Sequence, residues 1–173
     1  MDLHLNYYDT TNPGPATPIK WYVDYHIGIA CTNPPDITFS DALDVDGDGI
    51  CDIGLDWDDV EGYGPEHIVA TKLPAGYYVI SVNSFSLDRD PYAKISVTVK
   101  IGDSLFGPYV HTFTKADREG QDPDAWFRVV DIRVNTDGTI EVLSPNESLN
   151  PWHSSTAGAA RFAAPSLRKV KGK

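Results

Sequence analysis

The chain has 173 residues, of which 41% are hydrophobic and 11% aromatic, and this suits one globular domain with its own core. Residues 161–173 carry five basic residues and no acidic one, which leaves nine basic and 25 acidic residues before them, a net charge of -16. This body is expected to repel nucleic acids and anionic membranes. No apolar run approaches the roughly 18 residues of a membrane-spanning helix, so we also expect no membrane insertion.

The first residues predict a boundary inside a longer protein. Met1 is followed directly by "DLHLNYY", without a basic and apolar leader. We therefore expect no signal peptide here, and either an internal domain boundary or the start of a mature secreted protein.

Alternation of apolar and polar residues predicts a series of short strands. The expected strands, in chain order, are residues 3–8, 19–30, 77–85, 93–101, 108–114, 125–134 and 139–143. Turn sequences such as "NTDG" at residues 135–138 separate them, and no amphipathic helix longer than two turns is expected. The pattern predicts an all-β fold, an antiparallel β-sandwich of jelly-roll or Greek-key type, over residues 1–144. Residues 145–173 lose the alternation and are interpreted as an extended basic arm or linker, solvated or docked on an acidic surface of this or another copy.

Residues 36–66 are unusual because they hold eleven acidic residues and no lysine or arginine. We interpret them as one long loop between strands, since they are too polar for a strand. Neighbouring carboxylates near a surface repel each other by roughly 1–4 kcal/mol per pair. The loop is therefore expected to become compact only when cations neutralise it, and the alternative is a solvated acidic loop.

The spacing within this segment predicts a calcium site. "DVDGDGICD" places Asp44, Asp46, Asp48 and Asp52 at positions 1, 3, 5 and 9 of a loop. Gly49 stands at position 6, where such loops turn sharply, and Ile50 at position 7 would offer its backbone carbonyl. Position 12 is leucine instead of glutamate, so the segment resembles the shorter calcium loops of thrombospondin type 3 repeats and dockerins.

A second cluster follows directly and predicts a second, optional Ca²⁺ ion. Asp56, Asp58 and Asp59 lie within four residues, and Glu66 follows two glycines and a proline. Asp2 could approach from the first strand. The alternative is a tight turn whose acidic side chains cap backbone N–H groups.

The motifs of this region resemble a bacterial family. "DLHL" at the start, "LDWDD" at residues 55–59, "GYGPE" at residues 62–66, "PAGY" at residues 74–77 and a Trp-led strand at Trp126 are similar to the signature of YfaP-like domains. The resemblance spans most of residues 2–143 and departs in the "DVDGDGICD" insertion and after residue 145. It implies a β-sandwich from a periplasmic or surface protein, and it implies no particular activity.

The two cysteines, Cys31 and Cys51, are predicted to form a disulfide that closes a loop of about 20 residues, worth on the order of 3 kcal/mol. The alternative is a pair of buried free thiols. A disulfide would imply an oxidising compartment, and so an extracellular, cell-surface or periplasmic location.

No catalytic motif is recognisable, and the chain is not expected to be an enzyme. We expect a calcium-binding module with a structural, adhesive or assembly role, which could contact further copies of itself through the arm. The alternative is a carbohydrate-binding module stabilised by calcium. Its aromatic platform would come from Tyr22, Tyr78, Trp57 and Tyr63.

Overall fold

The computed structural model describes residues 1–23, 31–57, 65–84, 92–114, 125–149 and 168–170. The regular structure of these residues is antiparallel β-sheet, so the predicted all-β class is confirmed. Among them, no helix is long and apolar enough to cross a membrane.

The strands form three antiparallel sheets. They are β1 (Asp2–Tyr8), β2 (Trp21–Val23), β3 (Asp41–Leu43), β4 (Ile53–Trp57), β5 (His67–Ala70), β6 (Gly76–Asn83), β7 (Tyr92–Ile101), β8 (Ser104–Thr114), β9 (Trp126–Val134), β10 (Ile140–Leu143) and β11 (Arg168–Val170). The main sheet has the order β11-β10-β9-β6-β1-β2. The second sheet has the order β3-β4-β5, and the third is the β7–β8 hairpin.

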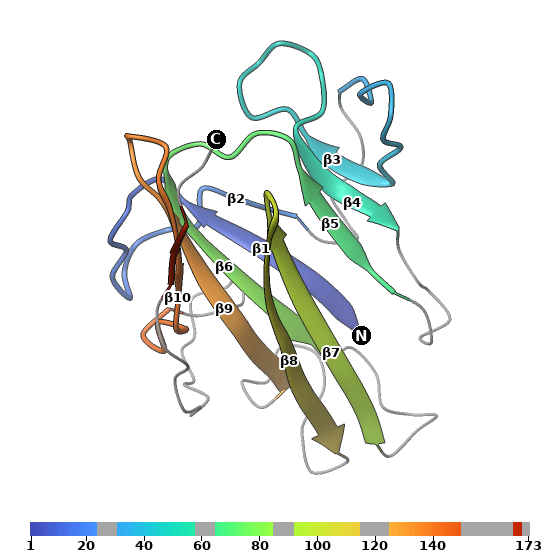
Figure 1. Cartoon of the computed structure of the whole chain (residues 1–173), viewed down its shortest axis with the longest axis vertical. Helices are drawn as coiled ribbons and strands as arrows, with labels where there is room; N and C mark the ends of the chain where they lie inside the picture. Colours follow the sequence, from blue (N-terminus) through green and yellow to red (C-terminus); the bar gives the residue numbers. More distant parts are fainter. Residues whose placement is uncertain (24–30, 58–64, 85–91, 115–124, 150–167, 171–173) are drawn as a thin grey trace.

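The two smaller sheets pack on one face of the main sheet and share its core. Figure 1 shows the β7–β8 hairpin in front of the main sheet, with β3, β4 and β5 above and beside it. Leu5 of β1 lies in one cluster with Ile53 and Leu55 of β4 and with Phe113 of β8, all 6% exposed or less. Burial of one such side chain contributes roughly 1.5–3 kcal/mol. This layering is that of a β-sandwich.

The opposite face of the main sheet is also covered at its centre, where consecutive residues of β6 are buried on both faces. Successive side chains of a strand point to opposite faces. Tyr77 and Val79 therefore pack with Leu149 on this second face, while Tyr78 enters the core between the sheets.

A buried ionic network crosses the second face. Asp131, with no exposed surface, accepts hydrogen bonds from the Arg128 guanidinium at 2.8 Å and from the Tyr77 hydroxyl at 2.7 Å. The backbone N–H of Asn146 donates to the same carboxylate at 2.6 Å, and Arg128 donates to the Leu149 carbonyl at 2.6 Å. Asn146 and Leu149, in the segment expected to form the arm, thus lie against the main sheet.

The described part of the arm is strand β11, which pairs with β10 at the edge of the main sheet. Ile140 of β10 lies opposite Val170 in this antiparallel ladder. Part of the arm thus adds a strand to the sheet of its own chain.

Seven strands lie where strands were predicted, and two, β3 and β4, lie where a loop was expected. Strand β5 follows that segment and was not predicted, and β11 lies in the expected arm. Strand β2 ends at Val23, and residues 24–30 of that predicted strand lie outside the described residues. Strands β3 and β4 lie inside the segment 36–66, so the interpretation of that whole segment as one loop is wrong. The loop proper is residues 44–52. Ile53 and Leu55 are buried, but Gly54 and the surrounding acids conceal this short alternation in the sequence.

Replacement of Asp131 by Asn is predicted to destabilise the fold strongly. The substitution keeps the size of the side chain but leaves the Arg128 charge buried without its counter-ion, which typically costs about 3–5 kcal/mol. Urea denaturation would measure the change in the free energy of unfolding. Asp103→Asn, the same substitution at the exposed β7–β8 turn, is the matched control and should change stability little. Equal stability of the two variants would contradict the importance of the network.

Candidate metal centre

The acidic loop of residues 44–52 connects two paired strands. Leu43 of β3 lies opposite Ile53 of β4, and the Asp52 N–H donates to the Leu43 carbonyl at 2.9 Å to close the loop. Gly47 and Gly49 have φ angles of 81° and 85°, which residues with a side chain rarely adopt. The sharp turn predicted at Gly49 is therefore present, and Gly47 supplies a second one.

The aspartates of the loop hold its backbone. Asp44 accepts hydrogen bonds from the Gly47 and Gly49 N–H groups at 2.7 and 2.8 Å, one on each carboxylate oxygen. Asp46 accepts from the Asp48 N–H at 3.2 Å, and Asp48 accepts from the Ile50 N–H at 2.8 Å. Such local bonds are typical of turns and fold the loop around its own carboxylates.

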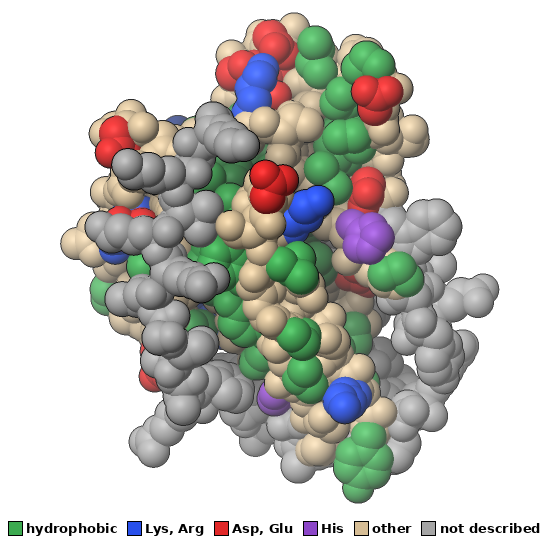
Figure 2. Space-filling model, in the orientation of Figure 1, with side chains coloured by type: hydrophobic (Ala, Val, Ile, Leu, Met, Phe, Trp, Pro, Cys, Tyr) green, Lys and Arg blue, Asp and Glu red, His purple; other side chains and the backbone are tan. Residues whose placement is uncertain are grey.

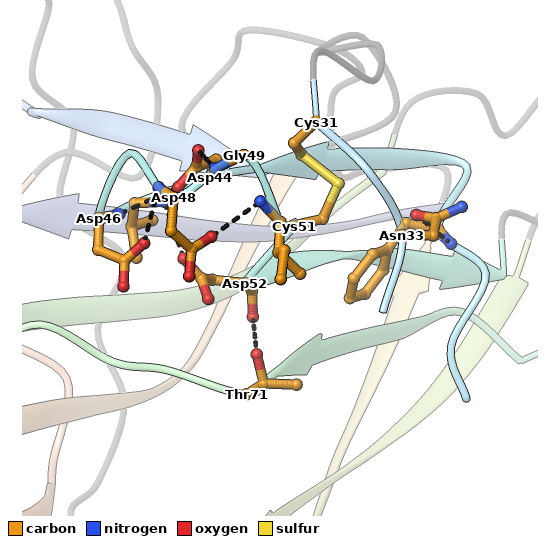
Figure 3. The surroundings of a disulfide bond; sticks show 12 residues. Cys31, Asn33, Asp44, Asp46, Asp48, Gly49, Cys51, Asp52 and Thr71 are labelled. Carbon is orange, nitrogen blue, oxygen red and sulfur yellow. Dashed lines mark hydrogen bonds between the residues drawn. A yellow bond between two sulfur atoms is a disulfide. The ribbon is translucent and has the colours of Figure 1, made fainter. Parts of the chain in front are cut away.

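The predicted disulfide is present, and it links the loop to the segment that begins at Cys31. Cys31 and Cys51 are bonded with a Cα–Cα distance of 5.2 Å, and no cysteine is free. Beside the disulfide, Thr32 pairs with the loop through bonds to Gly49 and Cys51. Figure 3 shows the disulfide next to the gathered aspartates. The disulfide also indicates an oxidising compartment outside the cytoplasm.

Three carboxylates converge on one point of the loop. Asp44, Asp46 and Asp48 each bring an oxygen within 4.8 Å of the others, and this is the one such group among the described residues. Each carboxylate oxygen has two lone pairs, so an oxygen that accepts a backbone N–H can still bind a cation. Several hard oxygen ligands on a turning loop fit a divalent ion such as Ca²⁺.

The carboxylates of the loop also form ion pairs with Lys72 of the same chain. Lys72 Nζ lies 2.6 Å from Asp46 Oδ2, 3.0 Å from Asp48 Oδ2 and 3.3 Å from Asp52 Oδ1. Figure 2 shows acidic and basic side chains together at the top of the molecule. Lys72 therefore offsets part of the charge of the loop from within the chain, which was not predicted from the sequence. Lysine at position 72 is visible in the sequence, but only the pairing of β4 with β5 brings it here.

Hydrogen bonding stabilises the charged forms of these groups. The N–H of Gly49 is the main cause of the lowered pKa of Asp44, and the Lys72 ammonium is the main cause of the lowered pKa of Asp48. In turn, hydrogen bonds to Asp46 and then Asp48 hold the pKa of Lys72 above its ordinary value. These pKa shifts favour the charged forms of Asp44, Asp48 and Lys72.

The remaining predicted ligands of the first site lie at its margin. Asp52 is 1% exposed, and its Oδ2 accepts from the Val45 N–H at 3.1 Å while its Oδ1 faces Lys72. Ile50 is 46% exposed, and the bridge to Thr32 uses the groups of Gly49 and Cys51 instead of the Ile50 carbonyl.

The residues predicted for a second ion are only partly brought together. Glu66 accepts a hydrogen bond from the Leu3 N–H at 2.6 Å, which places Glu66 next to the backbone at Asp2. Asp56 Oδ1 lies 3.6 Å from His67 Nδ1. His67 was not predicted from the sequence as a partner of this carboxylate. Asp58 and Asp59 lie outside the described residues, and the described ones form no second group of three converging ligands.

Tyr78, one of the four residues predicted for an aromatic platform, is not available to a ligand. Tyr78 is 1% exposed and donates a hydrogen bond to the Pro74 carbonyl at 2.6 Å, so its ring cannot stack on a ligand. The prediction failed because both faces of β6 are covered. Tyr22 is partly exposed on β2, opposite Asn6 of β1. Trp57 lies on β4, and Tyr63 lies outside the described residues.

Comparisons of the chain with protein-family models, with curated proteins and with solved structures found no significant match.

Replacement of Gly49 by Ala is predicted to destabilise the protein by about 1–2 kcal/mol, the cost of a left-handed conformation for a residue with a Cβ. The space around Gly49 is open, so the backbone angle is the only source of this cost. Gly14→Ala is the matched control, because Gly14 also has open space but no positive φ. Thermal unfolding of both variants measures the difference, and equal melting temperatures would contradict the required turn.

Proposed function

We propose that this chain is a non-enzymatic calcium-binding module of an extracellular, cell-surface or periplasmic protein. In this proposal a Ca²⁺ ion binds the loop of residues 44–52 and fixes its shape, and the stiffened domain serves adhesion or assembly. The observation that carries the proposal is the convergence of Asp44, Asp46 and Asp48 on a loop whose backbone is already folded around them.

The chemistry of the loop favours calcium over other common metal ions. Its side-chain donors are carboxylates, and the nearest cysteines are joined in the disulfide and cannot bind a metal as thiolates. Zinc prefers nitrogen and sulfur ligands, and magnesium retains several water molecules and uses only one or two carboxylates. Calcium accepts six to eight oxygen ligands in flexible geometry, which the carboxylates, a carbonyl such as that of Ile50 and water could supply.

An ion in this loop would act on the stability of the whole domain. Strand β4 follows the loop directly and carries Ile53 and Leu55 into the core between the sheets. A cation that binds the folded loop and not the unfolded chain stabilises the fold, and the stabilisation grows with the logarithm of the cation concentration above Kd. The disulfide restrains the same loop, so the ion and the covalent link would act together.

An adhesive or assembly role finds support in the outward face of the β7–β8 hairpin. Tyr92, Leu105 and Val110 are 64%, 69% and 51% exposed there, and hydrophobic side chains are visible along this hairpin in Figure 2. Exposed apolar residues gathered on one surface often mark a contact with another protein. The resemblance to YfaP-like domains of surface proteins agrees with such a role.

Calcium is predicted to raise the melting temperature of the protein, and EGTA to reverse the rise. At a calcium concentration a hundredfold above Kd, the stabilisation is about 2.7 kcal/mol. For a domain of this size that corresponds to a shift of roughly 5–10 °C in differential scanning calorimetry. An unchanged melting temperature over millimolar calcium would refute the proposal.

Asp46→Asn and Asp48→Asn test whether the rise in melting temperature with calcium comes from binding at this loop. Each keeps an oxygen that can accept the local backbone bond but removes one carboxylate charge from the loop, so the shift with calcium should shrink or disappear. Asp103→Asn, which removes the same charge from a distant turn, should keep the full shift. Magnesium at the same concentration should produce a smaller shift than calcium.

A further inference from the structure

Lys72 contacts three carboxylates of the candidate calcium loop at once. Its ammonium lies between Asp46, Asp48 and Asp52, at 2.6, 3.0 and 3.3 Å. Asp46 and Asp48 use their Oδ2 atoms for this contact, while their Oδ1 atoms accept backbone N–H groups of the loop. The oxygens that face away from the backbone are therefore the ones that hold the lysine.

The backbone next to Lys72 is fixed against the loop. Ile53 of β4 pairs with Ala70 of β5, so the residues just beyond them, Asp52 and Thr71, also lie together. Thr71 donates twice to the Asp52 carbonyl, from its N–H at 2.8 Å and from its hydroxyl at 3.1 Å. Figure 3 draws the bond from the hydroxyl. Lys72 is consequently held at the loop by the sheet, and its side chain has a high local concentration at the carboxylates.

A divalent ion on the outward oxygens and the ammonium would need the same space. Calcium binds carboxylate oxygens at about 2.3–2.6 Å, closer than the ammonium now lies to the same atoms. Two cations at such distances also repel each other strongly. The Lys72 side chain is 47% exposed and can turn into solvent without a rearrangement of the backbone.

We propose that Lys72 is an internal competitor of the divalent ion, which keeps the loop compact at low calcium and lowers the affinity of the loop for calcium. This inference rests on the proposed calcium function and adds a residue that sets the affinity of the site. Binding of Ca²⁺ displaces the Lys72 ammonium from Asp46 and Asp48. The domain then responds to calcium at higher concentrations than the carboxylates alone would require.

Replacement of Lys72 by Gln tests the competition through the calcium affinity. Without the Lys72 ammonium, whose positive charge would repel the calcium ion a few ångströms away, calcium binding is expected to tighten about tenfold. Isothermal titration calorimetry measures this change. Lys94→Gln on β7 changes the net charge equally at a residue exposed on another sheet, and should leave the affinity unchanged. Lys72→Arg keeps the charge and should keep the affinity within about twofold to threefold of the unsubstituted protein.

Chemical labelling of the unsubstituted protein gives a direct readout that needs no variant. Lysine acetylation by a small activated ester, followed by mass spectrometry, should modify Lys72 several times faster in calcium than in EGTA, while Lys94 and Lys100 show no such change. Faster labelling of Lys72 in calcium and tighter binding by Lys72→Gln support the competition. Equal calcium affinity of both proteins, with labelling of Lys72 unchanged, overturns the competition and leaves the calcium site intact. Absence of calcium binding in both proteins overturns the proposed function and this inference together.

Discussion

The mutual repulsion of the aspartates between β3 and β4 is the constraint around which this part of the molecule is built. Backbone N–H groups that donate to Asp44 offset part of this repulsion. The Lys72 ammonium, which contacts Asp46 and Asp48, offsets another part. The disulfide between Cys31 and Cys51 holds the same loop covalently. A loop restrained in these three ways presents its carboxylates together, which an unrestrained acidic segment would not do.

The loop depends in turn on the second sheet, because the pairing of β5 with β4 positions Lys72, which follows β5, at the loop. Strand β5 pairs with β4, and β4 carries the core residues Ile53 and Leu55. The register of this pairing places Thr71 on the Asp52 carbonyl and therefore Lys72 on the carboxylates. A substitution in the core at Ile53 or Leu55 would accordingly be expected to shift the position of the loop, since few residues separate them.

The main sheet shows how a buried polar group can organise a surface segment. Asp131 is held by Arg128 and Tyr77, and its carboxylate also binds the backbone of Asn146. Asn146 and Leu149, in the segment after β10 that has no alternation of its own, are thereby held against the sheet. Contacts with the sheet add to a local turn, in which the Ser148 N–H and hydroxyl donate to the Asn146 side chain.

The sequence by itself determined the all-β class, most of the strands, the acidic loop with its turn at Gly49, and the disulfide. These features depend on local patterns: alternation along a strand, the spacing of aspartates, a glycine where φ is positive, and a small number of cysteines. Only the tertiary structure decided that Tyr78 is buried, that β3 and β4 frame the loop, and that Lys72 pairs with three of its carboxylates. These outcomes depend on which strands become neighbours and in what register, and distant residues along the chain settle that pairing together.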